Sequence, residues 1–93
     1  MLIIAGYSTV DAEKQDEYVA AFRDLVQRAR AYEGCLDVAV TADPVDPTRI
    51  YVFEVWDSEE SLQKWRKIAN APSVDILRSD VKKYEISSVG PPL

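Results

Sequence analysis

The stretch from Gly34 to Trp65 constrains the fold most, because it reads in succession as a strand, a turn, a strand and a helix. Apolar residues alternate from Leu36 to Thr41, and a run of aromatic and β-branched residues extends from Arg49 to Trp56. Between the two runs lies a segment with two prolines and two aspartates. The prolines have no amide hydrogen to donate to a neighbouring strand, so this segment suits a turn that reverses the chain. The sequence therefore predicts an antiparallel hairpin with a longer-than-minimal loop.

A helix is predicted directly after this hairpin. Ser58 stands at the N-cap position, where its oxygen accepts a hydrogen bond from a free helix amide. Glu59 and Glu60 follow in the first turn, where acids complement the positive end of the helix dipole. The helix is expected to run to about Ile68, with Leu62, Trp65 and Ile68 or Ala69 facing inward.

The residues before the hairpin predict one strand and one long helix. Residues 2–10 are apolar on both faces of the predicted strand, so both faces should be covered. Residues 12–32 change to a helical period, and Gly34 is expected to end that helix. The inward stripe of the helix comprises Tyr18, Phe22, Leu25, Val26 and Ala29. Its water-facing positions are Glu17, Arg23, Asp24, Gln27, Arg28 and Arg30.

The residues after the hairpin and its helix predict a further short helix and a last strand. Asn70 and Pro72 break the preceding helix. The spacing of Val74, Leu77 and Val81 predicts a helix over residues 73–81. Residues 82–89 are expected to form the last strand, and residues 90–93 a frayed tail.

The predicted order is β-α-β-β-α-(α)-β within a single domain of residues 1–93, which is the ferredoxin-like, split βαβ arrangement of an α+β fold. Its four-stranded antiparallel sheet carries helices on one face only. Because the strands look apolar on both faces, a second copy of the same sheet is the simplest cover for the other face. The pattern predicts a homodimer formed through the sheet face.

Three segments of the chain carry a resemblance to a known family. They are Glu33-Gly34-Cys35, then Asp43 to Pro47, then Glu54 to Glu60. They resemble the start of the hairpin, the Asp-Pro-x-Asp-Pro turn and the Glu-x-Trp-x-Ser-Glu-Glu segment of the antibiotic biosynthesis monooxygenase (ABM) domain family. The resemblance implies a dimeric α/β barrel, in agreement with the homodimer expected from the pattern.

Composition excludes several classes of site. The chain has no histidine and a single cysteine, Cys35, which argues against zinc, iron or haem bound through these ligands. Its three glycines are too scattered for a phosphate-binding loop, so we expect no metal and no bound cofactor.

The net charge of −5 argues against nucleic acid or an anionic membrane as the main partner. The N-terminus shows no basic leader, and one cysteine fits a reducing compartment, so a cytoplasmic location is expected.

Cofactor-free oxygenation is possible for phenols, quinols and anthrones, whose stabilised anions can give an electron to oxygen themselves. The protein then supplies an apolar cavity, a base, hydrogen-bond donors for the anion and an orienting aromatic wall. The candidate base is Glu54, because it lies mid-strand between apolar neighbours. The candidate substrate-binding residues are Tyr7, Phe22, Tyr32, Tyr51 and Trp56.

The resemblance adds roles for two further residues within the segment VWDSEESLQKW. It implies that Trp65 borders the active cavity and orients the substrate ring. Ser61 stands where anthrone oxygenases of the family have an asparagine, and with Tyr7 it would donate a hydrogen bond to the developing anion. The haem-degrading branch of the superfamily has a histidine on the following segment, which this chain lacks.

Other interpretations of these residues stay open at this point. Burial alone can explain Trp65, and Glu54 can instead form an ion pair with Arg49, Arg66 or a lysine of a second copy. The same fold also serves isomerases and cyclases of enolisable carbonyls, and non-catalytic barrels that bind small molecules or accompany stress. A cavity of a few hundred Å³ reaching Trp65 would favour an enzyme, and a filled interior would favour the non-catalytic alternative.

Overall fold

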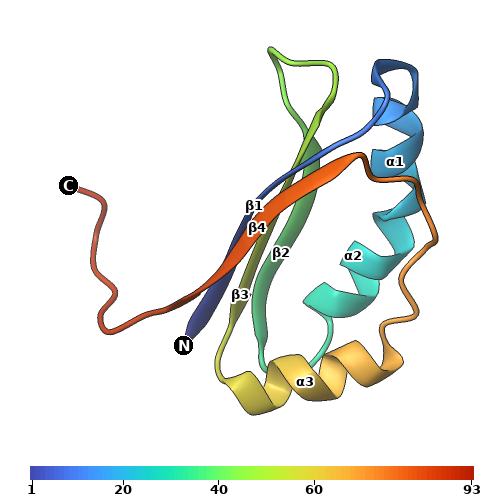
Figure 1. Cartoon of the computed structure of the whole chain (residues 1–93). Coiled ribbons are helices and arrows are strands. Elements are labelled where there is room, and N and C mark those ends of the chain that lie inside the picture. The colour runs from blue at the N-terminus through green and yellow to red at the C-terminus, as the bar shows by residue number, and fades with distance from the viewer.

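A computed structural model describes residues 1–93 and contains one four-stranded antiparallel sheet with strand order β2-β3-β1-β4 (Figure 1). The elements follow the chain as β1 (Leu2–Thr9), η1 (Ala12–Lys14), α1 (Gln15–Ala21), α2 (Arg23–Arg30), β2 (Cys35–Ala42), β3 (Arg49–Trp56), α3 (Glu59–Ile68) and β4 (Arg78–Glu85). This is the ferredoxin-like α+β fold, so the predicted fold class is confirmed.

The β2–β3 hairpin forms as predicted, and its loop is shaped by its aspartates as well as its prolines. The Asp43 carboxylate accepts hydrogen bonds from the amides of Val45 and Asp46, and the Asp46 carboxylate accepts two from Thr48. The side-chain amide of Gln15, at the start of α1, donates to the carbonyl of Arg49 at 2.9 Å. These bonds satisfy loop groups that have no ladder partner and attach the hairpin tip to the helical layer.

The long helix predicted over residues 12–32 is divided into η1, α1 and α2, with Phe22 between the last two. The Phe22 amide is shared between the carbonyls of Tyr18 and Val19, at 3.3 and 3.2 Å, so the helix tightens for one residue. The Phe22 ring stacks on Tyr18 with centroids 4.8 Å apart. Figure 1 shows the helix changing direction here, which keeps both halves against the twisted sheet. The predicted inward stripe is confirmed, because all of its members are buried or half-buried.

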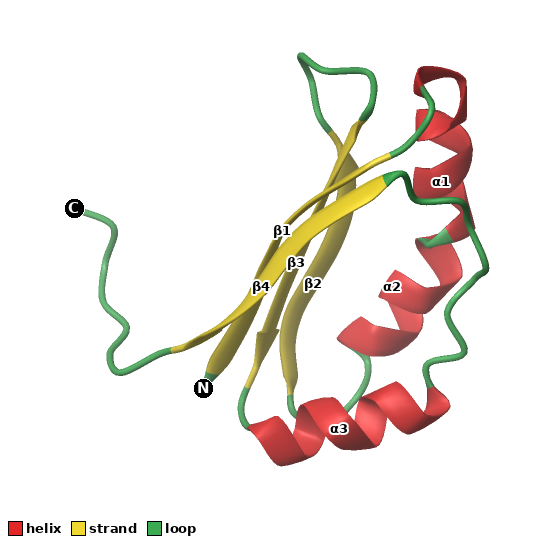
Figure 2. Ribbon diagram, viewed as in Figure 1, coloured by secondary structure: helices red, strands yellow, loops and turns green.

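All three α-helices lie on one side of the sheet, and the other side carries no helix (Figures 1 and 2). The main core lies between sheet and helices and consists of Leu2, Ile4, Ala29, Val38, Trp56, Leu62 and Trp65. A smaller cluster of Val10, Tyr18 and Ile50 packs under α1. None of the helices combines the length and the apolar character needed to cross a membrane.

The side of the sheet without helices, called the open face below, is also largely apolar. The strand register places on it Ile3, Ala5, Tyr7, Ala39, Tyr51, Phe53, Val55 and Tyr84. Tyr51 and Phe53, near its centre, are each 38% exposed. The prediction that the central strands are apolar on both faces is therefore confirmed, and one of these faces is not covered by any helix of the chain.

The helix predicted over residues 73–81 is wrong. Residues 69–77 have no helix or strand, and β4 begins at Arg78, four residues before the predicted start of the last strand. The Leu77 amide donates to the carbonyl of Thr9 at 2.8 Å, and Val81 pairs with Gly6. Pairing with the free edge of β1 gives this segment a full set of backbone hydrogen bonds. That pairing is more favourable than a short helix of three apolar residues after a proline. The strand ends at Glu85 rather than Val89.

Gly6 allows β4 to approach β1 closely. Its φ of +154° is one that residues with a side chain rarely adopt, and an added Cβ would lie 2.1 Å from the carbonyl oxygen of Asp80. That oxygen belongs to the backbone and cannot rotate away. Pairing between β1 and β4 therefore requires a glycine at this position.

We predict that Gly6→Ala lowers the free energy of unfolding by about 2 kcal/mol or more, because the methyl group forces β4 away from β1. Urea unfolding followed by tryptophan fluorescence measures the change. Gly90→Ala is the matched control, because no atom lies within 4 Å of the Cβ that it adds. Equal stabilities for the two variants would contradict the close approach of β4.

Candidate functional site

Three aromatic side chains meet at the centre of the helix-side core. Trp56 ends β3 and is fully buried, Trp65 lies on α3 and is 6% exposed, and Tyr32 lies in the turn after α2. The Tyr32 ring centroid is 5.4 Å from that of Trp65 and 6.4 Å from that of Trp56. The two indole rings are also 6.4 Å apart. The structure therefore brings together three of the predicted site residues, each contributed by a different part of the chain.

Glu54 lies beside this aromatic cluster. It points to the helix side of β3, between Ile4 on β1 and Val38 on β2. Its Oε1 accepts a hydrogen bond of 2.8 Å from Nε1 of Trp56, two residues further along the same face. A fully buried indole N–H requires an acceptor, and this carboxylate provides it.

The ion pair considered for Glu54 does not form within the chain, since no Lys or Arg nitrogen lies within 4.0 Å of its carboxylate. Arg49 lies on the open face, on the opposite side of the sheet. Arg66 is exposed on α3. The hydrogen bond from Trp56 is the one hydrogen bond that the side chain of Glu54 makes.

Arg28 belongs to the site, although the sequence placed it among the water-facing residues. Its guanidinium carbon lies 5.5 Å from the ring centroid of Trp65. Its Nη2 donates to the carbonyl of Ala69 at 2.7 Å, at the end of α3, and its Nε pairs with Asp24 at 2.8 Å. Arg28 thus fixes α3 and Trp65 against α2. The spacing of Asp24 and Arg28 was the only signal in the sequence, and it equally describes a surface pair.

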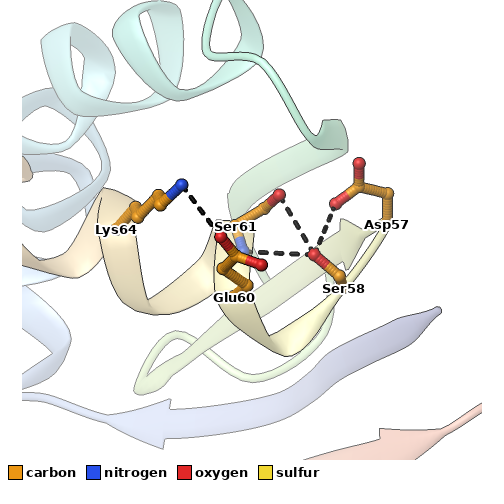
Figure 3. A network of polar contacts seen from close by, with 5 residues as sticks. All are labelled: Asp57, Ser58, Glu60, Ser61 and Lys64. Atoms are coloured by element: carbon orange, nitrogen blue, oxygen red, sulfur yellow. Dashed lines mark hydrogen bonds and ion pairs between the residues drawn. The ribbon is translucent and has the colours of Figure 1, made fainter.

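Ser61 lies at the start of α3, within a small polar network (Figure 3). The Ser58 oxygen accepts from the amide of Ser61 at 3.2 Å, so the predicted N-cap is confirmed. The Ser58 hydroxyl also lies 3.0 Å from the carboxylate of Asp57 and 3.1 Å from the hydroxyl of Ser61. Hydrogen bonds from Ser61 and Ser58 hold the pKa of Asp57 below its usual value, so Asp57 is a weak base.

A cavity of about 420 Å³ opens beside this network. It is lined by Tyr32, Glu33, Asp57, Glu60, Ser61 and Lys64. Tyr32 therefore contacts the buried tryptophans on one side and lines the cavity on the other. Neither Trp56 nor Trp65 lines a cavity, so the interior around both indoles is filled by side chains.

Gly34 positions Ser61 against the turn between α2 and β2. Its φ is +96°, and an added Cβ would lie 2.3 Å from the Ser61 hydroxyl oxygen. The amide of Asp57 donates to the carbonyl of Gly34 at 2.9 Å. The helix itself ends earlier than expected, at Arg30, and Gly34 instead forms the turn that leads into β2. A glycine is required here so that α3 can begin next to this turn.

The remaining predicted residues lie away from the cluster. Tyr7 and Tyr51 are on the open face, where the guanidinium of Arg49 lies 3.8 and 5.1 Å from their ring centroids. Phe22 stacks on Tyr18 between α1 and α2. The sheet separates Tyr7 and Tyr51 from Trp65, so one site within this chain cannot contain both sets of residues.

Cys35 lies near the cluster but is not activated. Burial and the charge of Glu54 both raise the pKa of its thiol, which keeps it protonated. No group of three or more Cys, Asp or Glu side chains is arranged to hold a metal ion. The chemical groups of the aromatic cluster are the carboxylate of Glu54, aromatic rings and the guanidinium of Arg28. The cavity beside it adds hydroxyl groups and the charged side chains of Glu33, Asp57, Glu60 and Lys64.

Comparison with known proteins identifies one family. The sequence model of the antibiotic biosynthesis monooxygenase family matches residues 1–70, which include β1 to α3. The proposed antibiotic biosynthesis monooxygenase of Deinococcus radiodurans has a similar structure, with a TM-score of 0.77 at 19% identity over 100% of this chain and 99% of that chain. The one from Chloroflexus aurantiacus is 28% identical, with a TM-score of 0.68 over 97% and 94% of the two chains.

One curated relative also matches. An uncharacterised protein of Synechocystis is 25% identical over 61 residues, which are 66% of this chain and 42% of that protein. The chain thus spans less than half the length of this relative.

We predict that Glu54→Gln unfolds at nearly the same urea concentration as the parent, because a glutamine oxygen can still accept from Trp56. Glu54→Leu leaves the buried indole N–H without an acceptor and should cost about 1–3 kcal/mol. Glu13→Leu, at an exposed position in η1, is the control for adding an apolar side chain. A Leu variant as stable as the Gln variant would show that the Trp56–Glu54 hydrogen bond contributes nothing to stability.

Proposed function

Because this chain belongs to the antibiotic biosynthesis monooxygenase family, we propose that it is a cofactor-free monooxygenase that oxidises an aromatic polyketide, anthrone or quinol with molecular oxygen. Family membership supports the reaction type. The observation that carries the proposal is the packing of Tyr32, Trp56 and Trp65 beside the carboxylate of Glu54, next to the cavity of about 420 Å³. Tyr32 is the one aromatic residue that lines this cavity, so a planar aromatic substrate reaches the indoles and Glu54 only when Tyr32 moves.

The proposed reaction on an anthrone needs only the substrate, oxygen and a base. The base removes a proton from the ring carbon, and the resulting anion gives an electron to O₂. A carbon–oxygen bond then forms as a hydroperoxide, which loses water and leaves a carbonyl group. One oxygen atom enters the product and the other leaves in water, so no external reductant is consumed.

Each residue of the cluster has a role in this scheme. Glu54 accepts the proton, and Trp65 orients the substrate ring. The hydroxyl of Ser61 turns from the carboxylate of Asp57 to donate to the developing anion. Tyr32 acts as the gate, because it lies between the cavity and the indoles, and the substrate ring takes its place. Trp56 and Arg28 hold Glu54 and Trp65 in position. Tyr7, Tyr51 and Phe22 lie outside this site.

We further propose that the protein is a cytoplasmic homodimer whose open faces pack together. The exposed aromatic residues at the centre of this face support the dimer, because a monomer would leave them in water. The single cysteine, Cys35, fits a reducing compartment.

A non-catalytic function is the second candidate, and the filled interior favours it. Trp56 and Trp65 line no cavity, so the cluster serves as core packing unless Tyr32 moves. In that case the protein would be a non-catalytic dimeric barrel that binds a small molecule or is associated with the stress response. An isomerase or cyclase acting on an enolisable carbonyl would use the same base and cavity but would consume no oxygen.

We predict saturable oxygen uptake by metal-free protein, without added cofactor, on a panel of anthrones, naphthols and quinols. Glu54→Gln should lower the rate by roughly 10²–10⁴-fold, the usual contribution of a positioned base, at an almost unchanged melting temperature. Trp65→Phe should lower it about tenfold or more through loss of orientation. An oxygen electrode measures uptake, and chromatography identifies the product.

Arg66→Gln is the control variant, because Arg66 is exposed and adjacent to Trp65 in the chain. It should retain the parent rate. Turnover of the panel without oxygen consumption would replace the proposal by an isomerase or cyclase. No reaction above the spontaneous rate, combined with stoichiometric binding of panel compounds, would support the non-catalytic barrel.

A further inference from the structure

A second cavity, of about 250 Å³, lies between α1 and the segment that leads from α3 to β4. Figure 1 shows this segment running past the helices before β4 begins. The cavity is lined by Val10, Tyr18 and Val74, together with exposed charged residues. None of the aromatic residues of the proposed active site lines it. It is therefore a separate candidate site, to which the proposed oxygenation assigns no role.

The inner wall of this cavity is apolar. Val10 is 1% exposed and Tyr18 is 5% exposed, and both belong to the small cluster under α1. Val74 packs against the same cluster from the segment between α3 and β4. The apolar part of a ligand in this cavity would therefore be removed from water and would contact aliphatic side chains, which favours binding.

Few interactions hold the segment that covers this cavity. Residues 70–76 form no backbone hydrogen bond, and the next one along the chain joins the amide of Leu77 to the carbonyl of Thr9. One ion pair, between Lys14 and Asp75 at 3.8 Å, connects the segment to η1. Both side chains are exposed, so this pair contributes little to stability. A segment with so few hydrogen bonds can adjust its position around a ligand.

The hydroxyl of Tyr18 is a hydrogen-bond donor without a partner. The side chain is almost fully buried, yet its hydroxyl forms no hydrogen bond within the chain. The one unpartnered side-chain atom that is closed off from solvent is Nε of Arg49, so the Tyr18 oxygen reaches an open space. The cavity that Tyr18 lines provides that space. Burial raises the pKa of Tyr18, so the hydroxyl keeps its proton and can donate it in a hydrogen bond.

The volume and the charges of the cavity limit the kind of ligand. A cavity of about 150 Å³ is enough for benzene, so one of about 250 Å³ suits a single substituted ring. Among the charged lining residues, Lys14 is paired with Asp75, and Glu17 adds a second carboxylate. The cavity therefore offers an anion no net positive charge, and a neutral ligand is favoured. The polar group of the ligand must accept the hydrogen bond that Tyr18 donates, as a carbonyl oxygen does.

We propose that this cavity binds a small neutral carbonyl compound with an apolar body the size of one ring, whose oxygen accepts a hydrogen bond from the Tyr18 hydroxyl. The apolar body packs against Val10 and Val74, and residues 72–75 cover it. This site shares no residue with the aromatic cluster or with the cavity beside Ser61. It therefore does not depend on the proposed oxygenation, and binding can be measured without turnover.

Titration of the full chain with acetophenone, followed by ¹H–¹⁵N NMR, tests this site. We expect saturable shifts at the amides of Tyr18 and Val74, with a Kd of about 1 mM, as is usual for a ligand of so few atoms. Tyr18→Phe should raise this Kd about three- to tenfold, the usual contribution of one hydrogen bond, at a nearly unchanged melting temperature. In α-methylstyrene a CH₂ group replaces the oxygen of acetophenone. This compound should shift the amides of the parent and of Tyr18→Phe equally.

Ala21→Leu enlarges a side chain that lines the cavity and should raise the Kd for acetophenone about tenfold or more, because it fills space that the ligand needs. Ala20→Leu is the matched control, because Ala20 is exposed in the same helix but does not line this cavity, and its Kd should equal that of the parent. Shifts confined to the surroundings of Tyr32 and Ser61 would place acetophenone in the other cavity and overturn the proposal. Equal Kd values for the parent and Tyr18→Phe, or no saturable shift at all, would overturn it as well.

Discussion

Helices cover only one face of this sheet, and the apolar side chains on its other face set the main constraint on the molecule. A chain of 93 residues buries only roughly 60–65% of its unfolded surface, so it gains stability from any further cover. A second sheet packed on the open face would supply that cover.

Alternate residues of β3 point to opposite faces of the sheet, so the proposed active-site residues and the proposed interface residues lie on different faces. Glu54 and Trp56 point toward the helices, whereas Arg49, Tyr51 and Phe53 point toward the open face. Consequently the proposed site lies wholly on one side of the sheet and the proposed interface on the other. Because each side has its own set of residues, variants of the open face test association and variants of the cluster test turnover.

Local signals in the sequence predicted much of the fold. The cap at Ser58 and the turn with two Asp-Pro pairs specify their own geometry, and β3 forms at its predicted bounds. The strand at Arg78 could not be predicted in this way, because it depends on pairing with β1, about 70 residues earlier in the chain. The break at Phe22 left no signal in the sequence, because its apolar stripe continues through it with a helical period. The same limit applies to the site. The two-residue spacing of Glu54 and Trp56 puts both on one face of β3. Only the folded chain shows that Tyr7 lies on the open face and that the guanidinium of Arg28 lies over Trp65.

Packing and chemistry are not competing explanations for the aromatic cluster. Removing the side chain of a buried tryptophan costs about 3–5 kcal/mol, so Trp65 is needed for stability whether or not it meets a substrate. Trp56 likewise requires Glu54 as an acceptor, which fixes a carboxylate in the core for a structural reason. A carboxylate held rigidly next to aromatic rings is also what proton abstraction from a planar acid requires. The difference between a core and an active site then depends on Tyr32, the one member of the cluster that also contacts the cavity.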